Sequence, residues 1–175
     1  FLLNHTVAER FRREAHVASR LEHPNIVEIS DFGMAENGRL FLAMELIEGQ
    51  SLGQAVEQHL PGVMPLPRAL TILSQVADAV GAAHDAGVLH RDLKPENIML
   101  RPSGTGGEVV KILDFGLAKL MVDEYSLVLT RRGEMFGTPM YMSPEQARGE
   151  ELDSRTDIYA FGAIAFELCT GRPPF

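Results

Sequence analysis

A short stretch of the chain gathers residue types that can move protons and bind cations. Residues 90–97 read His-Arg-Asp-Leu-Lys-Pro-Glu-Asn, Asp-Phe-Gly follows at 114–116, and Ser-Pro-Glu follows at 143–145. An aspartate carboxylate can accept a proton from a substrate hydroxyl, and carboxylate and amide oxygens are suitable ligands for Mg²⁺. Three motifs in this order, with a strand-sized segment between the first two, form a more specific signal than any one of them.

The ordered set resembles the signature of protein kinases, and most of all the eukaryotic-like Ser/Thr kinases of bacteria. The resemblance implies transfer of the γ-phosphoryl group of ATP to Ser/Thr hydroxyls of protein substrates. It assigns Asp92 as the catalytic aspartate and Lys94 as the lysine that meets the transferring phosphate. Asn97 and Asp114 would be the metal ligands for Mg²⁺, with Mn²⁺ as an alternative ion. His90 is interpreted as structural.

The same resemblance implies a nucleotide site. An apolar strand and the segment after it resemble the hinge that binds adenine, through the carbonyl of Glu45 and the amide and carbonyl of Ile47. Met44 corresponds to the gatekeeper position and Met99 to the floor beneath the adenine ring. Glu14 corresponds to the helix glutamate that pairs with a phosphate-binding lysine, and that lysine is expected outside the chain.

A further group of residues resembles a regulatory apparatus. Arg91, directly before Asp92, is typical of kinases controlled by loop phosphorylation. Glu134 stands where the family usually has a phospho-threonine, and we hypothesise that its carboxylate partly substitutes for the phosphate; a solvent-facing loop acid is the alternative. The other implied regulatory residues are Arg10 and Lys119 as phosphate ligands, Thr130 as a candidate phosphosite and Thr138 as a partner of the catalytic loop.

Apolar periodicity predicts the elements that position these residues. Residues three and four apart predict helices over 6–21 and 67–84, and an apolar run predicts a buried helix over 157–168. In the second helix the residues expected to face inward are Leu70, Leu73, Ala77, Val80 and Ala83 or His84. Strands are expected over 26–29, 40–47, 98–100 and 109–113, with a hairpin turn at 37–38 and a long loop over 119–136.

Asp157 corresponds to the family's buried aspartate that holds the His-Arg-Asp turn, with a helix N-cap as the alternative.

The order of elements, a helix with strands and then mostly helices, resembles the two-lobed α+β fold of protein kinases. We expect residues 1–47 to belong to the β-rich small lobe and residues 48–175 to the helical large lobe. No glycine-rich phosphate loop or strand lysine precedes Glu14, and the final helices of such a domain are missing. The chain is therefore expected to be a fragment, inactive and poorly folded on its own.

Composition narrows the functional classes. The chain has 175 residues and a formal net charge of −8, which argues against nucleic-acid binding. Its one cysteine, Cys169, excludes an internal disulfide, and its apolar neighbours predict burial. No apolar run reaches the roughly 20 residues of a membrane span. We expect a cytoplasmic catalytic domain whose partners are protein substrates. A dimer for trans-autophosphorylation is compatible with the family. Membrane attachment is expected only through segments outside the chain.

Two alternatives to an active protein kinase remain. The first is a kinase-fold module that acts by binding; all four predicted catalytic residues argue against it, although a missing strand lysine upstream would favour it. The second is a small-molecule phosphotransferase of related fold. The Gly-Thr-Pro motif at 137–139 and the Ser-Pro-Glu motif argue against this second alternative, because that segment serves protein substrates in the family.

Overall fold

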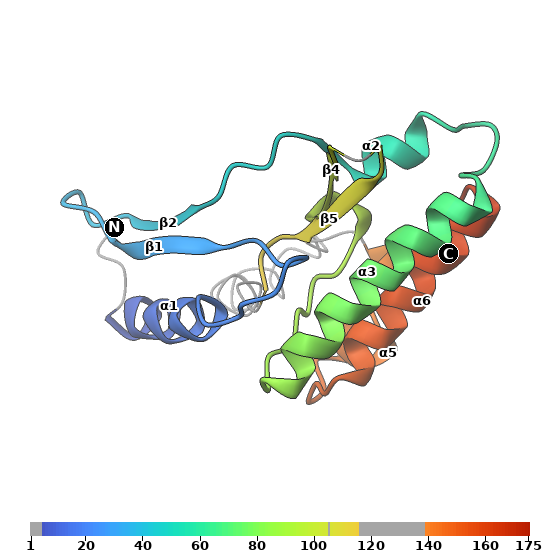
Figure 1. Cartoon of the computed structure of the whole chain (residues 1–175). Helices are drawn as coiled ribbons and strands as arrows, with labels where there is room; N and C mark the ends of the chain where they lie inside the picture. Colours follow the sequence, from blue (N-terminus) through green and yellow to red (C-terminus); the bar gives the residue numbers. More distant parts are fainter. Residues whose placement is uncertain (1–4, 105, 116–138) are drawn as a thin grey trace.

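The computed structural model describes residues 5–104, 106–115 and 139–175. These residues form two sheets and a set of helices, an α+β arrangement (Figure 1). One sheet pairs β1 (Ile29–Met34) with β2 (Leu40–Met44), and the other has the order β3 (Gln50–Ser51), β4 (Ile98–Pro102) and β5 (Glu108–Ile112). The helices are α1 (His5–Ala18), α2 (Leu52–Glu57), α3 (Leu66–Asp85), α5 (Pro144–Arg148) and α6 (Arg155–Thr170), with 3-10 turns η1 (Pro95–Asn97) and η2 (Pro139–Tyr141).

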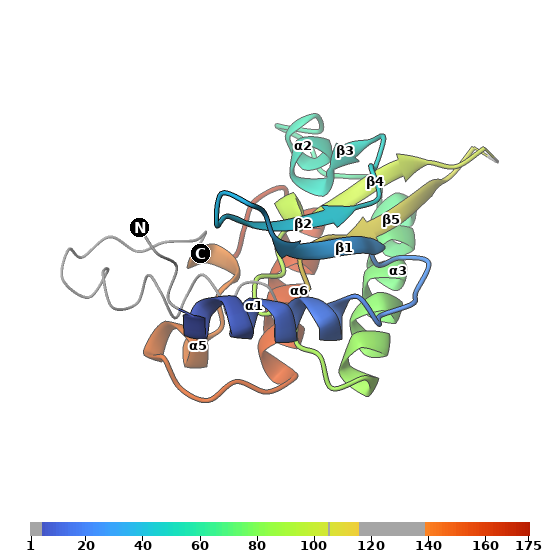
Figure 2. The ribbon, with the colours of Figure 1, turned by 90° about the vertical axis from the view of Figure 1, so that its left-hand side faces the viewer.

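The sheet of β1 and β2 lies over α1 (Figure 2). Its hairpin turn is confirmed at the predicted place: Gly38 has φ 76°, a left-handed conformation that favours glycine, and the Asn37 side chain accepts a hydrogen bond from the Arg39 amide at 3.0 Å. The predicted strand over 26–29 is partly right: Ile29 begins β1, whereas Ile26 forms an isolated parallel bridge with Ile112. Ile26 and Val27 are buried, and the Val27 amide donates to the Ile112 carbonyl at 3.0 Å, so this apolar run joins the segment before β1 to the other sheet. The second strand ends at Met44, earlier than predicted.

Strands β4 and β5 form the predicted hairpin. Ile98, Leu100, Val110 and Ile112 are buried, because alternate residues of a strand face the same side and this side packs into the core. Met99 and Lys111 stand opposite each other in the antiparallel register, on the other side of the sheet. The sheet therefore has a core face and a second face that carries Met99.

Helix α3 packs beside α6 and against β5 (Figure 1). The predicted inward face of α3 is partly wrong, because Leu70 is 56% exposed and Ala77 is also exposed. The buried residues are Ala69, Ile72, Val76, Ala79, Val80 and Ala83. Helix α6 likewise buries Ala160 and Ala163. Small side chains let two helices approach closely, so the inner face of α3 is rich in alanine, while Leu66 and Leu70 lie on the outside.

Helix α6 is buried on one face only within the described part of the chain, which corrects the prediction of a helix buried all round. Ile158 is 58% exposed and Phe166 is 44% exposed. Cys169 is also exposed, so its predicted burial is wrong. None of the helices described in the structure is long and apolar enough to cross a lipid bilayer.

The first turn of α6 carries a buried carboxylate, since Asp157 is 1% exposed. Its two oxygens accept hydrogen bonds from the backbone amides of His90 and Arg91, each at 2.8 Å. The His84 Nε2 atom of α3 lies 2.8 Å from the same carboxylate. A buried charge is tolerated only when it is well hydrogen-bonded, and these bonds fasten the 90–91 turn to both helices. The predicted role of Asp157 in holding this turn is confirmed.

We predict that replacing Ile72 destabilises the fold much more than replacing Leu70. Ile72→Ala removes a side chain that is 1% exposed, so it should cost about 2–5 kcal/mol of unfolding free energy. Leu70→Ala, on the outer face of the same helix, should change it by less than about 0.5 kcal/mol. Urea unfolding of the protein that carries the chain measures both, and equal losses would contradict the observed face of α3.

We also predict that Asp157→Asn lowers thermal stability. An asparagine offers one acceptor oxygen and turns an amide N–H₂ toward donors, so at least one buried N–H of the 90–91 turn loses its partner, at a cost of about 1–3 kcal/mol. The control is Asp153→Asn, four residues earlier, which removes an acid from a solvent-exposed pair with Arg155 and should leave the melting temperature unchanged. If Asp157→Asn melts like the wild type, the carboxylate does not hold the turn.

Candidate active site

The predicted catalytic residues of the 90–97 loop lie together. The Asp92 Oδ2 atom is 2.7 Å from Lys94 Nζ and 3.2 Å from Asn97 Nδ2. Asn97 Nδ2 also donates to the Asp92 backbone carbonyl at 2.8 Å. The Asp92 side chain is 41% exposed and that of Lys94 is 20% exposed. The loop thus orients a carboxylate and an ammonium group while leaving the carboxylate accessible from outside.

Asp114 is brought beside this loop by backbone hydrogen bonds. The Leu113 amide donates to the Asn97 carbonyl at 2.9 Å, and the Leu113 carbonyl lies 2.9 Å from His90 Nε2. The exposed Asp114 follows immediately. Because the Asn97 amide nitrogen is used by Asp92, the Asn97 side-chain oxygen is the atom that could face a cation. One carboxylate and one amide oxygen form a hard donor set that suits Mg²⁺ completed by phosphate oxygens.

His90 links these segments as a neutral ring. It is 0% exposed, and burial lowers the pKa of the imidazole despite the nearby carboxylates. Nε2–H donates to the Leu113 carbonyl, and Nδ1 accepts the Asp92 amide at 3.3 Å, which requires the neutral tautomer with the proton on Nε2. The ring meets Phe115 edge to face, with centroids 4.7 Å apart. These contacts confirm the structural interpretation of His90.

Two non-glycine residues of the site have left-handed backbone conformations: φ is 68° at Arg91 and 59° at Asp114. Such conformations are unfavourable and persist where the surroundings hold them. At Arg91 the surroundings are visible, since its amide donates to Asp157 and its carbonyl accepts from Gln146 Nε2 at 2.5 Å. Gln146 is itself oriented by a capping box with Ser143 at the start of α5.

The Arg91 side chain has a buried donor that no described residue accepts a hydrogen bond from. Its Nη1 atom is buried and has no hydrogen-bond partner among the residues that the structure describes. An unpaired donor of this kind is costly, and a guanidinium is best satisfied by an anion that accepts two hydrogen bonds. The arginine is therefore suited to receive an acidic group.

The predicted hinge residues follow the end of β2. Met44 is 37% exposed and pairs with Ile29 across the small sheet. The Glu45 amide donates to the Glu28 carbonyl at 3.0 Å. Ile47 is half-buried, and Met99 lies on β4 opposite Ser51 of β3. The chain thus crosses from the small sheet to the larger one at the predicted hinge.

The remaining predicted residues divide into two groups. Glu14 and Arg10 lie on α1, which packs against β1 and β2, and their roles stay predictions. Four predicted regulatory residues lie outside the described part of the chain: Lys119, Thr130, Glu134 and Thr138.

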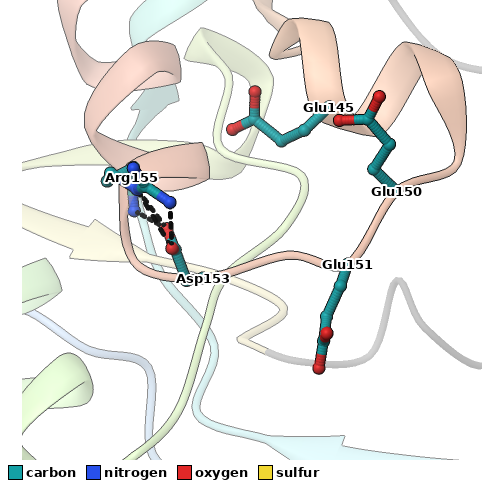
Figure 3. Close-up of a pocket in the computed structure, with 5 residues that line it drawn as sticks. All are labelled: Glu145, Glu150, Glu151, Asp153 and Arg155. Carbon is teal, nitrogen blue, oxygen red and sulfur yellow. Dashed lines mark hydrogen bonds and ion pairs between the residues drawn. The ribbon is translucent and has the colours of Figure 1, made fainter.

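An acidic cavity of about 300 Å³ lies where α5 leads into α6 (Figure 3). It is lined by Glu145, Glu150, Glu151, Asp153 and Arg155. Arg155 Nη2 pairs with Asp153 at 2.7 Å, and Glu145 accepts a hydrogen bond from Thr156 at 2.9 Å. None of the predicted catalytic or nucleotide-binding residues lines this cavity, so it is separate from the candidate active site.

Sequence reasoning missed residues that hold the site from a distance. The Ser143–Gln146 spacing is a capping-box signal and could have revealed Gln146, but its bond to the Arg91 carbonyl depends on the fold. Lys111, which pairs with Glu45, could have been noticed as a charge within the otherwise apolar run 109–113. Three or more His, Cys, Asp or Glu side chains do not converge as a metal cluster anywhere in the described residues.

A family model described as "Protein kinase domain" matches residues 3–175. Serine/threonine-protein kinase pkn3 of Myxococcus xanthus is 53% identical over 171 residues, which are 97% of this chain and 31% of pkn3. The probable serine/threonine-protein kinase PknB of Corynebacterium glutamicum is 44% identical over 170 residues, 95% of this chain and 25% of that protein. The chain thus spans less than a third of the length of these relatives.

Among solved structures, the kinase domain of PknI from Mycobacterium tuberculosis superposes with a TM-score of 0.76 at 32% identity, covering 99% of this chain and 61% of the PknI chain. The two chains therefore share the two-lobed α+β fold. Protein kinases as a family use ATP and a divalent metal ion. From the family match, the similarity to named bacterial Ser/Thr kinases and the shared fold, it follows that this chain belongs to the protein kinase family.

Proposed function

We propose that the protein carrying this chain is a Ser/Thr protein kinase that transfers the γ-phosphoryl group of ATP to hydroxyls of protein substrates. The observation that supports this most is the Asp92 carboxylate, held by Lys94 and Asn97 and still accessible. The relatives named as Ser/Thr kinases support the same substrate class.

In the proposed reaction each residue of the loop has one task. Asp92 accepts the proton of the substrate hydroxyl as that oxygen attacks phosphorus. Lys94 offsets the negative charge of the transferring phosphoryl group. Its ammonium lies 2.7 Å from the carboxylate that receives the proton, so it is close to the reacting atoms. Asn97 and Asp114 would hold Mg²⁺, with Mn²⁺ as an alternative, and the ion neutralises charge on the phosphate oxygens when bound.

The adenine is proposed to lie between the hinge and the face of β4 that carries Met99. The backbone of Glu45 and Ile47 would bind its edge, and Met44 and Met99 would line its apolar surfaces. This makes residue 47 the end of the small lobe and residue 48 the start of the large lobe. Glu14 is proposed to orient a phosphate-binding lysine supplied by the protein outside this chain.

Regulation is proposed to act through Arg91, whose buried Nη1 atom has no partner among the described residues. Two acidic groups of the same segment are candidates for this arginine: phosphorylated Thr130 and the carboxylate of Glu134. A phosphate carries about −1.5 to −2 charges and three acceptor oxygens, against one charge and two oxygens for a glutamate. A glutamate would therefore support only part of the activity that a phosphate supports.

We predict that Asp92→Asn lowers the rate of phosphoryl transfer by about 100- to 10,000-fold, because an amide cannot accept the hydroxyl proton. The measurement is transfer of labelled phosphate from ATP by the full-length protein, to itself or to a Ser/Thr protein substrate. Asp85→Asn, an exposed acid at the end of α3, is the matched control and should keep the wild-type rate. A wild-type protein that binds ATP but transfers no phosphate would instead be a binding module with a kinase fold.

We further predict that Glu134→Ala lowers the basal activity of the dephosphorylated protein. The reason is that the alanine cannot supply the anion that Arg91 requires. Rates of wild-type and variant protein are compared after phosphatase treatment, with Glu36→Ala, an exposed acid of the β1–β2 turn, as the control. Equal rates for wild type and Glu134→Ala would remove Glu134 from this role.

A further inference from the structure

Lys111 forms an ion pair at the junction of the two sheets. Its Nζ atom lies 2.5 Å from Glu45 Oε1 and donates a second hydrogen bond to the Ile26 carbonyl at 3.2 Å. The Lys111 side chain is 12% exposed and that of Glu45 is 27% exposed. Pairs removed from water to this extent interact more strongly than surface pairs and are less screened by salt. The contact is therefore a fixed part of the hinge region.

Glu45 is held to the chain before β1 at two points. Its amide donates to the Glu28 carbonyl at 3.0 Å, and its Oε1 atom accepts the Glu28 amide at 2.9 Å. The Ile112 amide in turn donates to the Asn25 carbonyl at 2.8 Å. One closed set of bonds thus joins the end of β2, residues 25–28 and β5, and Lys111 is the cation within it.

The charge state of Glu45 agrees with this arrangement. Burial alone would raise the pKa of its carboxyl, but the hydrogen bonds from Lys111 and from the Glu28 amide, together with the positive charge of Lys111, outweigh burial and lower the pKa. The ionised carboxylate is therefore the form that the surroundings stabilise. Without Lys111 the carboxylate would be drawn toward water, and its bond to the Glu28 amide would weaken.

The position of Lys111 relates this ion pair to the nucleotide. Lys111 stands opposite Met99 in the register of β4 and β5, so the two side chains are neighbours on one face of the sheet. Met99 is the proposed floor beneath adenine, and the Glu45 carbonyl is the proposed acceptor at the hinge. Lys111 thus joins the element under the base to the element at its edge.

We propose that Lys111 is a positioning residue for nucleotide binding: through the Glu45 side chain it holds the hinge backbone at the place and angle that adenine requires. This inference rests on the proposed function, because it takes Glu45 and Ile47 as the adenine-binding backbone. Holding a binding group in its bound conformation improves affinity by removing the ordering cost. Lys111 should therefore affect nucleotide affinity far more than the rate of transfer.

The same strand offers a matched control. Glu108 of β5 forms a two-pronged ion pair with Arg68 of α3, at 2.7 and 2.8 Å, with side chains 27% and 28% exposed. This pair also joins β5 to another element, but it lies at the other end of the strand and has no contact with the hinge. Arg68→Met therefore tests whether loss of any ion pair on β5 is enough.

The experiment uses the full-length protein and measures binding of ADP with Mg²⁺ by calorimetry, together with steady-state kinetics. Lys111→Met should weaken ADP binding and raise the KM for ATP by about 5- to 20-fold, while kcat changes by less than about twofold. Arg68→Met should leave both constants unchanged. Lys111→Arg, which keeps the cation, should retain most of the affinity.

A double-mutant cycle tests whether Lys111 acts through Glu45. Glu45→Gln keeps an acceptor for the Glu28 amide but removes the charge, and it should weaken ADP binding about as much as Lys111→Met does. Adding Lys111→Met to Glu45→Gln should then have little further effect. Glu45→Gln also provides the test if Lys111→Met fails to fold.

The outcomes separate the two proposals. A wild-type protein that binds no ADP would overturn the proposed function and this inference with it. A wild-type protein that binds ADP and transfers phosphate, with unchanged ADP binding by Lys111→Met or Glu45→Gln, would overturn the inference alone. Additive effects in the double variant, or a loss of kcat at constant KM, would also overturn it, because they would indicate a general structural role.

Discussion

The candidate active site depends on one buried carboxylate. Asp157 is nearly inaccessible to water, and an ionised group in that position must be satisfied by donors from the protein. Its donors are the backbone amides of His90 and Arg91, with His84 beside them. Satisfying Asp157 therefore fixes the turn just before Asp92 against α6. The left-handed conformation of Arg91 is one consequence, because both its N–H and its C=O are held by hydrogen bonds.

Backbone hydrogen bonds extend this anchorage to the rest of the site. The neutral His90 ring joins the Asp92 amide to the Leu113 carbonyl, and the Leu113 amide returns to the Asn97 carbonyl. Apart from the His90 ring, these bonds use main-chain groups, so they leave the carboxylates of Asp92 and Asp114 free for chemistry. This explains how residues on loops can be placed firmly while Asp92 stays accessible. The bonds of Asp157 and His90 thus hold the 90–97 loop through atoms that contact no substrate in the proposed reaction.

Local patterns predicted the parts of the structure that depend on local sequence. The motif residues Asp92, Lys94 and Asn97 lie together because they are close along the chain, and the hairpin of β4 and β5 follows from alternation. Properties set by tertiary partners were harder to predict. Leu70 was expected inside, yet packing of α3 beside α6 favours alanine there. The short helix α2 was not predicted, and the pairing of Lys111 with Glu45 brings together residues far apart in sequence, which no local pattern specifies.

The β4–β5 hairpin links the two ends of the proposed nucleotide site. Asn97, a proposed metal ligand, ends η1 directly before β4, and Met99, proposed to lie beneath the base, is the second residue of β4. The partner strand is held at both places: Lys111, opposite Met99, pairs with the hinge, and Leu113 bonds to the Asn97 carbonyl. A displacement of the hinge would therefore act on a strand that is also tied, two residues after Lys111, to the Asp157-anchored loop. Because both parts of the proposed site adjoin one hydrogen-bonded hairpin, the proposed positions of the base and of the phosphates are constrained together.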